Sequence, residues 1–175
     1  MTGQYTLDQT ERAVTERLRG LRVDGEAMAA ISNLYRAAGA VRNHLERTVL
    51  AEHDLTWTAW VVLWVVWVWE SIETRHAASE AGISKSTLTG VVITLEKRGL
   101  VRRAPFPADG RRVVLSLTPK ADRLLRRLFP DFNRQEAHAV ELLGAGETRA
   151  LTQALRKIVQ HLERESEQPA RPPAP

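Results

Sequence analysis

The 175-residue sequence contains no cysteine, which excludes disulfide bonds, thiolate metal sites and thiol-based redox sensing. It also lacks a membrane-spanning run, because its longest apolar stretch, residues 57–69, is shorter than the about 20 residues that a helix needs to cross a bilayer. The polar residues 1–5 show no signal-peptide core. We therefore expect a cytoplasmic protein without a membrane partner.

Motifs of catalysis are absent too. The sequence has no glycine-rich phosphate loop, no nucleophile elbow and no clustered pair of carboxylates, so we expect neither an enzyme nor a resident cofactor and assign no catalytic residue. The histidines are scattered, and none pairs at the i, i+4 spacing of a helical metal site. Surface ion pairs explain them more simply, so no metal ligand is assigned, although a zinc-responsive protein remains an alternative. These histidines are His44, His53, His76, His138 and His161.

The charge is mildly basic, with a formal net charge of +4 and a pI near 9.9. Such a balance suits a polyanionic partner but does not identify one, since many basic proteins never contact nucleic acid. The position of the cations along the chain is therefore more informative than their sum.

Apolar spacing predicts a mostly helical chain. Four tryptophans between residues 57 and 67 step by three, four and three, which places them on one helical face and favours a helix over a valine-rich strand. The expected helices are 7–21, 25–52, 57–69, 73–81 and 85–98, then one from Pro119 that kinks at Pro130 and, after a break at 144–146, a last one carrying Leu151 to Leu162. Thr56, Ser84 and Thr118 are expected as N-caps, and Gly82 and Gly99 are expected to end the helices before them.

Residues 73–118 have the order helix, tight turn, helix, strand, turn, strand, which is the layout of a helix-turn-helix followed by a hairpin. Gly82 supplies the positive φ that the tight turn needs. The second helix has one apolar face, and its N-terminal end exposes Lys85, Ser86, Thr89 and Gly90. A major groove admits one such helix, and its N-terminal side chains then reach base edges. An ordinary polar helix face is the plainer interpretation.

The hairpin has strands at 100–106 and 113–117, with a turn at 107–110 between them. Arginines near the tip of a β-ribbon fit a narrow minor groove, where negative potential is concentrated. Asp109 is unusual beside DNA, and we expect it to hold the guanidinium of Arg111. A solvated hairpin without DNA contacts is the alternative. The arginines concerned are Arg102, Arg103, Arg111 and Arg112.

Several segments together resemble the core signature of the MarR (multiple-antibiotic-resistance regulator) family. Each is weak alone, but their order and spacing match over roughly residues 24–165. The segments are Leu55-Thr56, Ile83 to Thr89, Leu95 to Arg103, Asp109 to Arg112 and Leu117-Thr118.

This resemblance implies a recognition helix over residues 84–98 and a wing with Asp109 and Arg111 as a pair and Arg112 beside them. It also implies a two-fold homodimer on a pseudo-palindromic double-stranded operator, and a repressor released by a small molecule that binds between the dimer region and the DNA-binding lobe. The DNA-facing residues of the helix would be Ser84, Lys85, Ser86, Thr87 and Thr89.

The chain departs from the family at Gly90, where many members have Arg or Lys. Glycine costs a helix about 1 kcal/mol relative to alanine. It allows close approach to the DNA backbone, or it reflects packing alone.

The tryptophan stripe has two interpretations, core packing or part of an aromatic ligand pocket. Arg42 lies two turns beyond Tyr35 and would either pair with an anionic effector or form a surface or inter-subunit salt bridge. The candidate residues for a small anionic or aromatic effector are Tyr35, Arg42, Trp57, Trp60 and Trp64.

The expected fold is mainly α with a small β-hairpin wing, in which a winged helix-turn-helix lobe is flanked by dimerisation helices. The expected parts are N-terminal dimerisation helices (1–52), the DNA-binding lobe (53–118), C-terminal dimerisation helices (119–165) and a disordered tail (166–175). The expected function is sequence-specific transcriptional regulation. A sequence-neutral DNA-coating protein is an alternative beside the zinc-responsive regulator.

Overall fold

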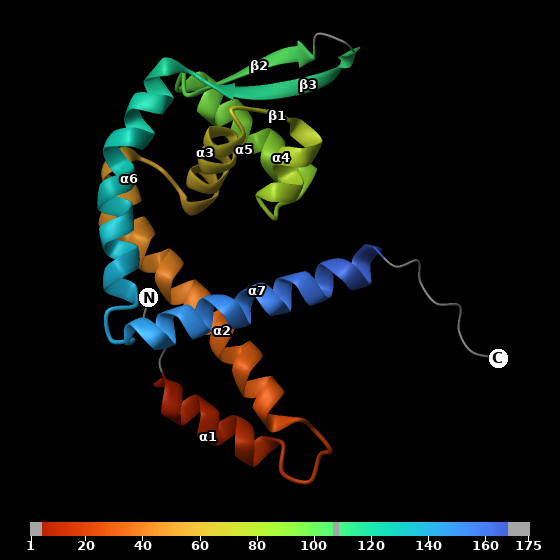
Figure 1. Ribbon diagram of the computed structural model, residues 1–175, viewed down its shortest axis with the longest axis vertical. Coiled ribbons are helices and arrows are strands. Elements are labelled where there is room, and N and C mark those ends of the chain that lie inside the picture. The colour runs from red at the N-terminus through yellow and green to blue at the C-terminus, as the bar shows by residue number, and fades with distance from the viewer. Residues whose placement is uncertain (1–4, 107–108, 168–175) are drawn as a thin grey trace, which may run out of the picture. The chain divides into compact units, whose positions relative to one another are not determined.

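The protein is described from a computed structural model over residues 5–106 and 109–167, with the backbone alone described for residues 109–111 and 167. The chain divides into two compact units, Met1–Asp122 and Arg123–Pro175. The N-terminal helices and the whole small sheet belong to the first unit (Figure 1). The predicted mainly helical fold with a β-wing is confirmed.

The N-terminal helices begin at side-chain caps. Thr6 and Gln9 form a reciprocal capping box, and Asp24 accepts from the backbone N–H of Ala27. The first helix was expected to reach residue 21 but ends at Arg17, because Gly20 adopts a φ of +87° that a right-handed helix does not allow. The elements are α1 (Leu7–Arg17), α2 (Gly25–Leu45), the π-turn η1 (Glu46–Leu50) and the 3₁₀-turn η2 (Ala51–His53).

The tryptophan-rich segment is helix α3 (Trp57–Trp69), as its spacing predicts. Thr56 accepts from the N–H of Ala59, and Glu46 accepts from the N–H of Trp57, so two of the otherwise unsatisfied N–H groups at the helix start are bonded. The rings of Trp60 and Trp64 have centroids 6.1 Å apart. Trp60 is buried, whereas the Trp57 and Trp64 side chains are half-buried.

A three-stranded antiparallel sheet follows, in the order β1-β3-β2, made of β1 (Ser71–Glu73), β2 (Val101–Phe106) and β3 (Asp109–Leu117). Its first strand is absent from the sequence-based expectation, which placed Glu73 at the start of a helix. Three residues are too few to show the alternation of apolar and polar side chains that marks a strand. Residues 71–73 form a strand because they pair with β3, where Glu73 lies opposite Val114. Asp109 and Gly110 were expected in the turn but belong to β3, where Asp109 lies opposite Phe106.

Between β1 and β2 lie α4 (Thr74–Glu80) and α5 (Lys85–Lys97), which form the predicted helix-turn-helix (Figure 1). Gly82 takes a φ of +61° in the turn, and Gly99 a φ of +66° after the second helix, as their positions predict. Ser84 accepts from the N–H of Thr87, which confirms it as the N-cap of α5. The core of this lobe contains buried side chains from α3, α5 and β3, including Leu63, Val66, Leu95 and Leu115.

Helix α6 (Pro119–Ala139) begins at the predicted cap, since Thr118 accepts from the N–H of Ala121, and it continues as a helix through Pro130. In the second unit, α7 (Ala145–Glu167) starts inside the expected break at 144–146, because Gly144 bonds to Glu147 and Thr148 and closes the first turn. Helix α7 includes Ser166, which lies inside the expected tail, and residues 168–175 of that tail lie outside the described residues.

Among the described residues, no single helix is long and apolar enough to cross a membrane. The segments 25–53 and 57–69 reach that length and apolar composition only when they are joined across a bend of 78°.

Candidate nucleic-acid interface

Helix α5 has one face fixed in the lobe and one face in solvent. Leu88, Val92 and Leu95 are buried, with exposed fractions of 3% or less. At its C-terminal end, the guanidinium of Arg98 donates to the backbone oxygens of Asp54 (2.6 Å) and His53 (2.8 Å). These bonds join the recognition helix to the corner between η2 and α3, so the direction of α5 is set from both sides.

The N-terminal end and exposed side of α5 carry every helix residue expected to contact DNA, and all of them are exposed: Ser84, Lys85, Ser86, Thr87, Thr89 and Gly90. Their hydroxyls are bonded locally. Ser84 Oγ lies 2.8 Å from both Ser86 Oγ and Thr87 Oγ1, and Thr89 donates to the backbone oxygen of Lys85. The face therefore presents a pre-ordered row of small hydroxyl groups with one cation, which suits phosphates and base edges.

Gly90 lies in the middle of this face. Apart from its chain neighbours and the nearby backbone of its own helix, a Cβ at Gly90 would meet no atom of the described chain within 4 Å. Contacts with other parts of the described chain therefore do not require glycine at this position.

The first strand of the wing directs its two arginines to opposite faces. Arg103 shares a face with the buried Val101, and its Nη2 lies 2.5 Å from Oε2 of Glu96 on α5. The hydrogen bond to Glu96 raises the pKa of the Arg103 guanidinium above its ordinary value, so this charge is fixed. Arg102 is exposed on the other face of β2.

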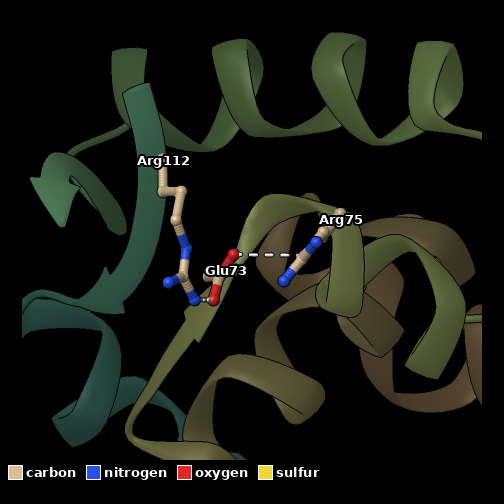
Figure 2. A network of polar contacts seen from close by, with 3 residues as sticks. All are labelled: Glu73, Arg75 and Arg112. Atoms are coloured by element: carbon tan, nitrogen blue, oxygen red, sulfur yellow. Dashed lines mark hydrogen bonds and ion pairs between the residues drawn. The ribbon is translucent and has the colours of Figure 1, made fainter. Parts of the chain in front are cut away.

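Arg112 is half-buried on β3, next to Val113, which lies opposite Pro105 near the turn end of the hairpin. Its Nη2 pairs with Oε1 of Glu73, and its guanidinium stacks over the ring of Phe106 at 4.4 Å. The Nε of Arg75 lies 3.2 Å from the other oxygen of Glu73, so one carboxylate holds two arginines (Figure 2). The expected pair of Asp109 and Arg111 falls on residues whose side chains lie outside the part of the chain that the structure describes.

A groove of about 630 Å³ separates the exposed face of α5 from the wing, and we call it the helix–wing groove. Three cations line it, from α4, α5 and β2 respectively: Arg75, Lys85 and Arg103. Thr74 and Thr89 add hydroxyl groups, above a floor of apolar side chains that includes Leu88 and Val92. Thr74 and Arg75 were not expected at this site. Their position follows from strand β1, which the sequence analysis missed and which ends directly before α4 begins at Thr74.

Comparison with known proteins agrees with this geometry. Residues 55–113, which span the helix-turn-helix and most of the wing, match the model of the MarR family. The HTH-type transcriptional regulator YwaE of Bacillus subtilis is 33% identical over 159 residues, covering 89% of this chain and 93% of that relative. The chain belongs to the MarR family. It is accordingly a DNA-binding transcriptional regulator.

Solved structures of the MarR family share the fold. Sco3205 of Streptomyces coelicolor, solved in complex with DNA, is 24% identical with a TM-score of 0.72 and covers 85% of this chain and 95% of its own. PcaV of the same organism, solved in complex with its natural ligand, is 26% identical with a TM-score of 0.64, covering 73% of this chain and 89% of its own.

The residues expected to form an effector pocket in this MarR-family chain are not gathered around one cavity. Tyr35 is 76% exposed and Arg42 is exposed on α2, whereas Trp60 is 3% exposed in the core. The four cavities described within residues 5–106 and 109–166 are lined by other side chains.

The histidines of the described residues do not form a metal cluster, since no group of three His, Asp or Glu side chains there is placed to hold an ion. His138 Nδ1 lies 2.8 Å from Glu141 and His161 Nε2 lies 3.7 Å from Glu165. Both histidines therefore contact a surface carboxylate of their own helix or the turn that follows it.

Proposed function

We propose that this MarR-family regulator is a homodimer in the cytoplasm that binds a pseudo-palindromic operator and represses transcription until a small effector releases it. The observation that carries the proposal is the exposed hydroxyl-rich face of α5 beside the cationic helix–wing groove. Two such faces, related by a two-fold axis, would enter successive major grooves about one helical turn apart.

The homodimer is supported by apolar side chains that the described residues leave exposed on the flanking helices. In α7, Leu151, Val159 and Leu162 are 42%, 54% and 57% exposed, and they share a helical stripe. In α2, Ile31 is 43% exposed. Stripes of this kind are buried when a second copy packs against them.

The wing arginines, of which Arg103 lines the helix–wing groove, are proposed to contact DNA together with six exposed residues at the start of α5. These six are Ser84, Lys85, Ser86, Thr87, Thr89 and Gly90. Arg112 contributes through its contacts with Glu73 and Phe106. The pair of Asp109 and Arg111 near the tip would reach a minor groove.

The effector proposed is a small anionic or aromatic molecule, and the exposed side chains of Tyr35 and Arg42 on α2 are the candidates to contact it. PcaV, which shares the fold, is described with a natural ligand, and this supports ligand control. An effector shifts the equilibrium only by its different affinity for the DNA-bound and the released conformations.

The test is binding of the purified protein to a labelled duplex from upstream of its own coding region and to a scrambled duplex, over a salt series. We expect tight binding to the first duplex at two chains per site, with a linear fall of log K against log salt. Addition of aromatic acids should then lower the affinity.

Two results would contradict the proposal. Equal binding to both duplexes, repeated with a genomic fragment library, would favour a sequence-neutral DNA-coating protein. Binding that appears only with added zinc and disappears with a chelator would favour the zinc-responsive regulator.

A further inference from the structure

The carboxylate of Glu73 lies at the end of β1 and connects the wing to α4 (Figure 2). Its side chain is 11% exposed, and its two oxygens face different arginines, Arg112 on β3 and Arg75 in the first turn of α4. A largely buried carboxylate is stable in this position because two guanidinium groups balance its charge.

Arg112 is the fixed member of this cluster. Its guanidinium stacks on Phe106, and its Nε is buried without a hydrogen-bond partner among the described residues. The carboxylate of Glu73 is therefore held in place from the side of the sheet.

Arg75 is the open member of the cluster. Its side chain is 61% exposed, it meets Glu73 through Nε, and it lines the helix–wing groove with Lys85 and Arg103. An ion pair through Nε leaves the terminal amino groups at the end of the guanidinium for a second anion.

We propose that Arg75 contacts a DNA phosphate at the helix–wing groove and that Glu73, fixed by Arg112, is the positioning residue that holds Arg75 ready for it. The proposal deepens the proposed function and rests on it. A held arginine loses less side-chain freedom on binding than a free one, so the carboxylate strengthens the contact although its own charge repels phosphate.

Because of this repulsion, the direction in which DNA affinity changes on replacing Glu73 distinguishes the two possible roles of this residue. If Glu73 acted only as a charge near DNA, its replacement by glutamine would strengthen DNA binding. If Glu73 positions Arg75, the same replacement weakens binding.

The first measurement compares Arg75→Gln with wild type on the operator and scrambled duplexes over a salt series. We expect about tenfold weaker binding to both duplexes near 0.1 M salt and a salt slope smaller by about one. The matched control is Arg12→Gln, which removes the same charge from an exposed site on α1 and should leave the slope unchanged. An Arg75→Gln variant that binds like Arg12→Gln would overturn the phosphate contact.

The second measurement compares Glu73→Gln with Glu80→Gln, which neutralises an exposed glutamate at the other end of α4. We expect Glu73→Gln to bind DNA about three- to tenfold more weakly, and Glu80→Gln to bind equally or more tightly. In an Arg75→Gln background, Glu73→Gln should cause a clearly smaller loss than it causes in the wild-type protein, because part of its effect passes through Arg75. Tighter DNA binding by Glu73→Gln would overturn the positioning role. A double variant whose fold-loss in affinity equals the product of the two single losses would overturn it as well.

Thermal melting of each variant shows whether a change in DNA affinity comes from loss of the fold. If Glu73→Gln melts at a lower temperature, Arg75→Gln still tests the phosphate contact, because the exposed Arg75 side chain can be replaced without disturbing the core. If the wild-type protein bound neither duplex at low salt, the proposed function itself would be contradicted. If the wild-type protein bound DNA and the Arg75→Gln variant bound it equally well, only the present inference would be contradicted.

Discussion

The exposed face of α5 and the arginines of the wing are supported in different ways, although Lys85 of the first and Arg103 of the second line the same helix–wing groove. On α5 the hydroxyls of Ser84 and Thr89 are bonded within three or four residues along the chain. At the wing, Arg103 is held by Glu96 on α5, and Arg112 is held by Glu73 on β1. Glu73 and Arg112 are 39 positions apart in the chain.

This difference suggests separate roles for the two regions. Side chains that depend only on their own helix can be exchanged one at a time, which suits the reading of different base sequences. Cations held by distant carboxylates depend on the folded lobe and suit contacts with phosphates, which are the same in every operator. Each prediction below tests one side of this contrast.

The largest expected effect comes from removing the support that both regions share. Leu95 is fully buried on the inner face of α5. Leu95→Ala should therefore lower the free energy of unfolding by about 3 kcal/mol, because burial is lost and a cavity is left unfilled. Chemical denaturation measures this change. The control Ile93→Ala, at a side chain that is 40% exposed on the same helix, should cost less than about 1 kcal/mol. Equal losses would show that α5 does not pack through the Leu95 face.

The next effect separates the two faces of the wing. Arg103 lines the groove and Arg102 points to the other side of β2, so Arg103→Gln should weaken binding to every duplex about tenfold at low salt. Arg102→Gln should weaken binding no more than about threefold. Titration of a labelled duplex compares the two variants, and a larger loss for Arg102→Gln would place the DNA on the opposite face of the hairpin.

A smaller effect concerns the start of α5. Ser84→Ala removes the N-cap bond to Thr87 and should lower stability by about 1 kcal/mol, measured by thermal or chemical unfolding. Ser86→Ala removes a neighbouring hydroxyl without the cap, so it should leave stability nearly unchanged and shift the preference among operator variants. If both variants lost the same stability, the local support described for this face would be wrong.

The smallest effect concerns Gly90, where the two measurable quantities should change in opposite directions. Because a Cβ at this position meets nothing within the chain, Gly90→Ala should raise stability by about 0.5 kcal/mol through helix propensity. The added methyl group should nevertheless weaken DNA binding if the backbone approaches DNA here. Unchanged DNA affinity in a stabilised variant would mean that glycine has no role in the contact.

Much of this molecule follows from local sequence. The caps at Thr56, Ser84 and Thr118, and the positive φ at Gly82 and Gly99, lie where the sequence places them, because each depends on a side chain and backbone within a few residues. The exposed face of α5 follows from the same spacing, which buries Leu88 and Leu95 on its other side.

The sequence alone determined a mostly helical chain with a helix-turn-helix, a hairpin and a set of polar residues on one helix face, since short-range periodicity and caps encode all three. Only the tertiary structure decided that Ser71–Glu73 is a strand, that Glu73 joins Arg112 to Arg75, and that Arg98 holds the corner at His53 and Asp54. These features depend on pairings between residues far apart in the chain, and such pairings leave no periodic trace in the segments that make them.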